Sequence, residues 1–158
     1  MGFNPDIHDK IYVVECKDEG YWYVGSTLQE LYDRADEHSG VKPGGCKWVR
    51  LHGGLKKIYF LEEVDTTEAQ RIENDVTAFM MTWFGRTKVR GGDHNNCRKD
   101  CYTAWLGWLP EHLRAGDVPP LHACVMPHFP LKLRRLINRF ESLSGLHHPD
   151  QLYADVFS

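Results

Sequence analysis

Two short runs of strand-forming residues, separated by a turn sequence, constrain the fold of this chain more than any other feature. Residues 11–14 (IYVV) and 21–24 (YWYV) are rich in β-branched and aromatic side chains, which favour extended strands. Residues 17–20 (KDEG) lie between them and end in a glycine that suits a tight turn. The pattern therefore predicts an antiparallel β-hairpin.

Helix and strand patterns follow one another after this hairpin. Thr27 and Glu30 form a capping-box pattern, which predicts a helix that starts at Thr27. Its apolar face is expected at Leu28, Leu31, Tyr32 and Ala35. Residues 57–61 predict a third strand, and a second helix is expected from about Asp65 to Trp83, ended by Gly85.

These elements predict an α+β fold with two parts. Residues 1–95 are expected to form a small three-stranded, mainly antiparallel sheet flanked by helices. Residues 96–158 are expected to form a mostly helical C-terminal extension that packs on the first part. Apolar residues at helical spacing predict one face of its last helix, at Leu133, Leu136, Ile137, Phe140 and Leu143.

Composition excludes several classes of protein. The 158 residues are 42% hydrophobic and 26% charged, which is ordinary for a globular fold and argues against disorder. No apolar run approaches the ~20 residues of a membrane-spanning helix, and the first ten residues lack the pattern of a secretory signal. We therefore expect a cytoplasmic protein, intracellular or nucleoid-associated, with no membrane partner.

The charge distribution restricts how the chain can bind a polyanion. The net charge of −3 argues against wholesale electrostatic binding of nucleic acid, which would then depend on local basic patches. Solvated surfaces are the alternative interpretation of such patches. The candidate nucleic-acid-binding residues are Lys47, Arg50, Arg90, Lys132, Arg135 and Arg139.

Three residues have the chemistry of a phosphodiester-cleaving site. Arg34 and His38 are four residues apart and share one face of the first helix, where a guanidinium can neutralise a phosphate while an imidazole moves protons. An exposed arginine beside a helix-terminal histidine is the alternative. Glu73 lies in the apolar stripe of the second helix; it either pairs with a surface cation or binds a divalent metal ion.

Five features occur in a characteristic order: IYV at 11–13, YVG at 23–25, R-x-x-x-H-S-G at 34–40, Glu73, and VRGG at 89–92. This order resembles the GIY-YIG nuclease family, in which two tripeptides lie on a β-hairpin. The resemblance covers roughly residues 10–95, and the V-R-G-G segment is typical of one subgroup.

The resemblance implies a Mg²⁺-dependent (or Mn²⁺-dependent) endonuclease that hydrolyses DNA. In that family pattern Tyr12 acts as the general base or positions the water, and Tyr23 supports it and holds a phosphate oxygen. Arg34 stabilises the transition state, His38 accepts a proton from Tyr12 or holds it in place, and Glu73 binds the metal ion. A phenol with a pKa of ~10 is a poor base unless nearby cations lower that pKa; Arg34, His38 and the metal ion are the expected agents.

The chain departs from the family pattern in one position that bears on activity. The family often has an asparagine after the glutamate, and none occurs in residues 88–92. Asn95 and Asn96 are the candidates for its role, and Arg90 is the alternative, as a phosphate ligand. A catalytically inactive nucleic-acid-binding module on the same fold is therefore the alternative function. Monomer and weak homodimer both remain open.

The C-terminal part holds a second set of candidate ligands. Cysteine and histidine are the usual ligands of structural Zn²⁺, although this spacing matches no standard finger. The alternative is a set of buried, unliganded cysteines with exposed histidines, and a zinc-dependent protein-interaction domain is a third function to consider. The four candidate ligands are Cys97, Cys101, His122 and Cys124.

Overall fold

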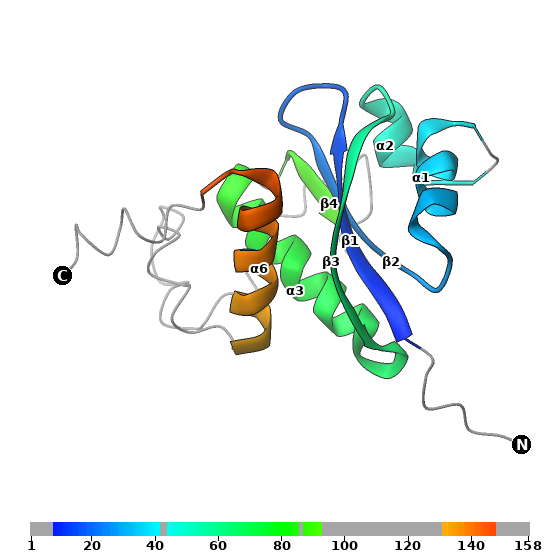
Figure 1. Cartoon of the computed structure of the whole chain (residues 1–158). Helices are drawn as coiled ribbons and strands as arrows, with labels where there is room; N and C mark the ends of the chain where they lie inside the picture. The colour runs from blue at the N-terminus through cyan, green and yellow to red at the C-terminus, as the bar shows by residue number, and fades with distance from the viewer. Residues whose placement is uncertain (1–7, 42–43, 86, 93–130, 148–158) are drawn as a thin grey trace, which may run out of the picture.

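A four-stranded sheet forms the centre of the protein, seen in a computed structural model that describes residues 8–41, 44–85, 87–92 and 131–147. The strand order is β3-β1-β2-β4 (Figure 1). Strand β1 pairs antiparallel with β2 and β3, whereas β2 and β4 are parallel. The strands are β1 (His8–Cys16), β2 (Trp22–Thr27), β3 (Leu55–Asp65) and β4 (Val89–Gly91).

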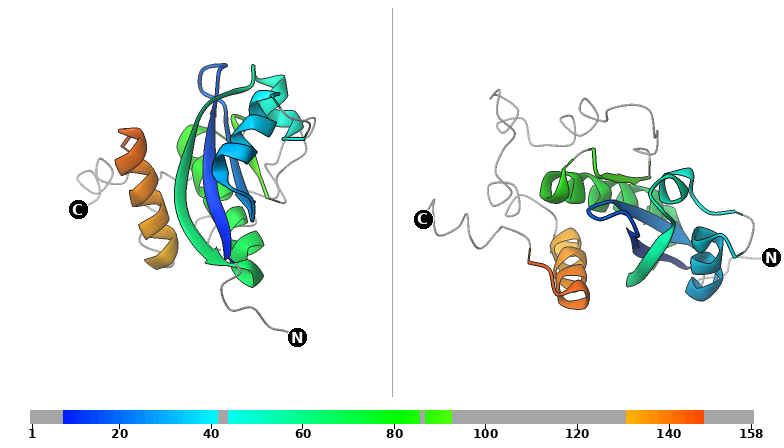
Figure 2. Two further views of the ribbon diagram at one scale, coloured as in Figure 1. Left: turned by 45° about the vertical axis from the view of Figure 1, so that its right-hand side comes forward. Right: turned by 90° about the horizontal axis from the view of Figure 1, so that it is seen from above.

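Helices cover both faces of this sheet, which gives the expected mixed fold. Helices α3 and α6 lie on one side, and α1 and α2 lie on the other (Figure 2). No helix in the described ranges is long and apolar enough to cross a membrane. The helices are α1 (Leu31–Ser39), α2 (Lys47–Leu51), α3 (Thr66–Phe84) and α6 (Leu131–Ser144).

The β1–β2 hairpin is confirmed, and its register positions the site residues. Tyr12 lies opposite Gly25, and Val14 lies opposite Tyr23. Gly20 occupies the turn with φ of 86°, a conformation that glycine adopts without steric cost. Because side chains alternate along a strand, Tyr12 faces α1 and α2 while its neighbour Val13 faces α3 and α6.

The first helix starts later than the capping pattern predicts. Thr27 is the last residue of β2, and its hydroxyl accepts a hydrogen bond from the backbone N–H of Gln29 at 3.0 Å. Glu30 is the N-cap residue instead. Leu28 and Tyr32, expected on the apolar face, are 59% and 68% exposed. The prediction was wrong because a threonine can satisfy a turn as readily as a helix end.

The sheet has one strand more than predicted. Strand β4 contains only three residues, all buried, and pairs with β2 through Trp22, Tyr23 and Val24. Three residues are too few to show a strand period, and a parallel pair requires a long crossover connection that local pattern does not reveal. The expectation of three strands therefore needs this correction, whereas the mainly antiparallel character holds.

Helix α3 follows the sequence prediction closely. The side chain of Asp65 accepts a hydrogen bond from the backbone N–H of Thr67 at 2.9 Å, and Gly85 is the C-cap residue. Its buried face packs on the sheet together with α6, and both helices contribute to one continuous core. The expected last helix is confirmed as α6, where Leu133, Leu136, Ile137 and Phe140 are buried; Leu143 is 44% exposed.

Replacing Phe140 by alanine tests whether α6 is an integral part of the core. Its ring is fully buried and lies 5.5 Å from the rings of both Trp22 and Tyr59. We expect Phe140→Ala to lower the free energy of unfolding by about 3–5 kcal/mol in urea titrations. Leu143→Ala on the same helix is the control and should cost less than about 1 kcal/mol. Equal, small effects of the two variants would contradict a shared core.

Candidate active site

Two tyrosines from the hairpin lie side by side beneath α1. Tyr12 is fully buried and Tyr23 is 7% exposed, and their ring centroids are 6.4 Å apart. The ring of His38 lies 5.8 Å from that of Tyr12 and 5.3 Å from that of Tyr23. Strand alternation brings both tyrosines to this face of the sheet, so an aromatic cluster forms where α1 crosses the hairpin.

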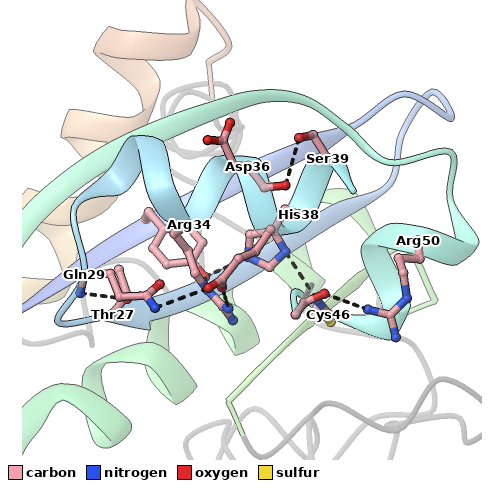
Figure 3. Close-up of polar contacts among 11 residues, drawn as sticks. Thr27, Gln29, Arg34, Asp36, His38, Ser39, Cys46 and Arg50 are labelled. Atoms are coloured by element: carbon pink, nitrogen blue, oxygen red, sulfur yellow. Dashed lines mark hydrogen bonds and ion pairs between the residues drawn. The ribbon is translucent and has the colours of Figure 1, made fainter. Parts of the chain in front are cut away.

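Two of the predicted site residues, Arg34 and His38, meet at the hydroxyl of Tyr12. Nε of Arg34 donates a hydrogen bond to it at 3.0 Å, and Nε2 of His38 lies 2.9 Å from it. Figure 3 shows both side chains projecting from the same face of α1. The prediction that a four-residue spacing places them together is confirmed, and a basic group and an imidazole therefore share one phenolic oxygen.

Two residues that the sequence prediction did not include fix the direction of Arg34. The Nη1 atom of Arg34 donates to Oε2 of Glu37, and the amide of Gln29 donates to Oε1 of Glu37 at 3.2 Å. The hydrogen bond from Arg34 holds the pKa of Glu37 below its ordinary value. Their signal in the sequence is the three-residue spacing between Arg34 and Glu37 on a helix.

His38 is held at both nitrogens inside the protein. It is 1% exposed, and the backbone N–H of Cys46 donates to its Nδ1 at 3.4 Å (Figure 3). Burial is the main cause that lowers its pKa to about 4, and Arg34 adds to the effect. At neutral pH the imidazole is therefore uncharged.

The pKa of Tyr12 moves in the direction opposite to the sequence-based expectation. Burial raises it to about 12, and the Arg34 guanidinium offsets only part of that shift. Burial likewise raises the pKa of Tyr23 well above its ordinary range. His38 does not supply a positive charge because it is neutral. In this conformation Tyr12 is thus a protonated phenol at neutral pH.

Glu73 enters the site from the other side of the sheet, from helix α3. It is 6% exposed, accepts a hydrogen bond from the Ser26 hydroxyl at 2.7 Å, and accepts another from the backbone N–H of Gly92 at 2.8 Å. A Cβ on Gly91 would lie 2.5 Å from Oγ1 of Thr77, so a glycine is needed for β4 to come this close. The Gly92 amide lies in the zone where the family asparagine is missing, and the sequence carries no signal of this backbone donor.

Gly25 makes room for the hydroxyl of Tyr12. A Cβ at Gly25 would lie 2.4 Å from the Tyr12 hydroxyl, far inside van der Waals contact. We expect Gly25→Ala to displace Tyr12 and lower the rate of phosphodiester cleavage by about 10²-fold. Gly20→Ala in the same hairpin is the control: nothing lies within 4 Å of a Cβ there, so Tyr12 stays in place, although the φ of 86° costs an alanine about 1–2 kcal/mol of stability. A Gly25→Ala rate no lower than that of Gly20→Ala would show that the Tyr12 position is unimportant.

The predicted nucleic-acid-binding residues before residue 100 differ in exposure. Lys47 and Arg50 are exposed on α2, on the same side of the sheet as Tyr12. Arg50 also donates to the Gly44 carbonyl at 3.1 Å. Arg90 is only 4% exposed, with its guanidinium 4.5 Å from the Trp48 ring centroid. Lys47 and Arg50 are therefore accessible to solvent at this face, whereas little of Arg90 reaches the surface.

The predicted basic residues of α6 lie on the opposite side of the sheet. Lys132 pairs with Glu68 at 3.3 Å, and Arg135 pairs with Glu62 at 3.6 Å. Arg135, Arg139 and Glu62 line a groove of about 620 Å³ between β3 and α6. The structure thus divides the basic residues into two groups, and acidic neighbours reduce the positive potential of the α6 group.

The proposed zinc ligands lie outside the described residues. Cys97, Cys101, His122 and Cys124 all fall between residues 93 and 130, so this prediction stays a prediction. Among residues 8–41, 44–85, 87–92 and 131–147, no group of three or more His, Cys, Asp or Glu side chains is arranged to hold a metal ion.

The fold thus gathers two phenols, an imidazole, a guanidinium and a buried carboxylate at one sheet. Residues 9–77 match the family model of the GIY-YIG catalytic domain, so this segment of the chain is similar to that family of nuclease domains. The resemblance carried by the two tripeptides is thereby confirmed. No curated protein and no solved structure matches the chain.

Proposed function

We propose that the chain is a metal-dependent endonuclease that cleaves phosphodiester bonds of DNA. The observation that carries the proposal is the Tyr12 hydroxyl, which is shared by Arg34 and His38 within a GIY-YIG catalytic domain. The phenolic oxygen of Tyr12 has both a cation and an imidazole within 3.0 Å. Such a pairing suits proton transfer beside a developing negative charge.

In this proposal Tyr12 takes a proton from the attacking water, and Arg34 stabilises the charge on the phosphate. Tyr12 is fully buried, whereas the side chain of Arg34 is 23% exposed. Tyr12 has to lose its phenolic proton first, and the Arg34 Nε–H at its oxygen stabilises the tyrosinate that results. Tyr23 supports the Tyr12 ring and holds a phosphate oxygen.

Glu73 is the proposed ligand of the divalent metal ion. Mg²⁺ prefers oxygen ligands and is often held by one or two carboxylates together with substrate phosphate. The chemistry of the donor set fits, since a buried carboxylate and the Ser26 hydroxyl lie 2.7 Å apart. When bound, Mg²⁺ or Mn²⁺ would supply charge stabilisation at the leaving oxygen.

DNA is proposed to reach the site from the face that carries α1 and α2. Lys47 and Arg50 are exposed there, where they would contact phosphates next to the scissile bond. The basic residues of α6 would need a second DNA segment, because the sheet separates them from Tyr12. We further propose a cytoplasmic location, with residues 1–95 as the nuclease part.

Cleavage of supercoiled plasmid and of single-stranded DNA tests the proposal directly. We expect cutting with Mg²⁺ or Mn²⁺ and none with EDTA, and the ratio of nicked to linear plasmid will report whether one or both strands are cut. Binding without cutting in either metal, measured by gel shift at several salt concentrations, would contradict the nuclease assignment.

A further inference from the structure

Each ring nitrogen of His38 contacts one group, and the group at Nδ1 can only donate a hydrogen bond. A backbone N–H is always a donor, so Nδ1 of His38 must accept the hydrogen bond from Cys46 at 3.4 Å. The other nitrogen, Nε2, faces the Tyr12 hydroxyl at 2.9 Å, and a hydroxyl can donate or accept. The Cys46 amide therefore decides which nitrogen carries the ring proton.

The electrostatic surroundings leave the imidazole with a single proton. Burial is the main cause that lowers the pKa of His38 to about 4, so the doubly protonated form is absent at neutral pH. Two cations and one carboxylate also act on the ring, and the cations oppose protonation. The charged and titratable groups that face it are Arg34 and Glu37 of α1, Arg50 of α2, Tyr12 of β1 and Tyr23 of β2.

We propose that the Cys46 amide fixes His38 as the Nε2–H tautomer, so that His38 donates a hydrogen bond to Tyr12 and does not accept its proton. His38 is then a positioning residue that favours the tyrosinate form of Tyr12. The inference rests on the proposed nuclease function for its consequence, though not for the tautomer itself. The sequence left two roles open for His38, as the acceptor of the Tyr12 proton or as a residue that holds Tyr12 in place. This inference selects the second.

Two donors then converge on one phenolic oxygen. Arg34 Nε–H and His38 Nε2–H both point at the Tyr12 hydroxyl, and donors at an oxygen favour its anionic form. Tyr12 is a buried phenol at neutral pH, so its proton leaves to a water molecule that enters with the substrate. The tyrosinate takes a proton from the water that attacks phosphorus, and the phenol is restored. His38 keeps its Nε2 proton throughout.

The backbone conformation of residues 44–46 brings the Cys46 amide close to the imidazole of His38. A Cβ at Gly45 would lie 2.6 Å from the Glu37 carbonyl oxygen, and its φ of 82° also favours glycine. Arg50 donates to the Gly44 carbonyl at 3.1 Å and ties the loop to α2. The loop therefore approaches the end of α1 closely enough for the Cys46 N–H to reach the imidazole.

Nitrogen-15 NMR of the histidine side chains tests the tautomer without any need for activity. We expect the two-bond ¹H–¹⁵N pattern of the Nε2–H form for His38 at pH 7, assigned by its loss in His38→Gln. Cys46→Ala retains the amide and should leave this pattern unchanged, whereas Cys46→Pro removes the amide and should produce a mixture of tautomers. An Nδ1–H or doubly protonated His38 in the wild-type chain would overturn the proposal, even if Cys46→Pro fails to fold.

Replacing His38 tests its role in the reaction. Glutamine can donate a hydrogen bond to Tyr12 but cannot take up a proton, so His38→Gln should cut DNA within about tenfold of wild type and with the same pH profile. His38→Ala should be slower by about 10²-fold. A His38→Gln rate as low as that of His38→Ala would overturn the donor role. If the wild-type chain does not cut DNA, the nuclease proposal fails while the NMR result still decides the tautomer.

Discussion

Glu73→Gln is expected to abolish metal-dependent cleavage, with a loss of about 10³-fold or more in rate. The variant removes the negative charge proposed to hold the metal ion. It also places an amide NH₂ where the carboxylate accepts hydrogen bonds from Ser26 and from the Gly92 amide, so one donor meets another. The plasmid-nicking rate across a Mg²⁺ titration is the measurement, and added Mg²⁺ should not restore activity.

A control variant at a second carboxylate, Glu63, distinguishes loss of the metal site from a general effect of lost charge or lost folding. Glu63→Gln removes the same charge from an exposed position on β3 and should cut at the wild-type rate. Thermal unfolding of both variants checks the fold, and Glu73→Gln is expected to be less stable by about 1–3 kcal/mol because a buried donor loses its acceptor. Cutting by folded Glu73→Gln within tenfold of wild type would show that the active site lies elsewhere.

Arg34→Lys is expected to slow cleavage by about 10³-fold although the charge is retained, since an arginine at a phosphoryl-transfer site contributes on this scale. The guanidinium donates from Nε to Tyr12 and from Nη1 to Glu37 at the same time. A single ammonium at the end of a flexible chain cannot reproduce this fixed pair of donors. Single-turnover cleavage of a DNA duplex with saturating enzyme isolates this effect from DNA binding.

The control for this substitution lies on helix α3. Arg71→Lys changes an arginine whose side chain is 58% exposed and pairs with Glu68, and it should leave the rate unchanged. DNA affinity of Arg34→Lys, measured by gel shift, should remain within about threefold of wild type because the charge at the site is the same. A rate for Arg34→Lys equal to that of Arg71→Lys would mean that only charge at this position matters.

Local sequence patterns were sufficient to predict the hairpin, helix α3 and the meeting of two site residues. The Gly20 turn, the Asp65 cap and the Gly85 stop each act over a few neighbouring residues, where spacing directly reflects backbone geometry. Arg34 and His38 meet at Tyr12 for a similar reason, because helical spacing fixes which side chains share a face.

Hydrogen bonds made by backbone amides could not be predicted from the sequence. The amides of Gly92 and Cys46 hold Glu73 and His38, and every residue except proline has such an amide, so no residue type marks it. Strand β4 was missed because its pairing depends on tertiary contacts. The raised pKa of Tyr12 was missed because burial, which decides its sign, is a property of the folded chain.

The proposed metal site depends on strand β4 staying paired at the edge of the sheet. It is an edge strand of three residues, and the next residue, Gly92, supplies a hydrogen bond to Glu73. Short edge elements open locally at free energies well below that of global unfolding. A transient opening of this edge would release the carboxylate while the β1–β2 hairpin and helix α3 stay folded. Heat is therefore expected to abolish the proposed nuclease activity reversibly at temperatures where the far-UV circular dichroism is still that of the native protein.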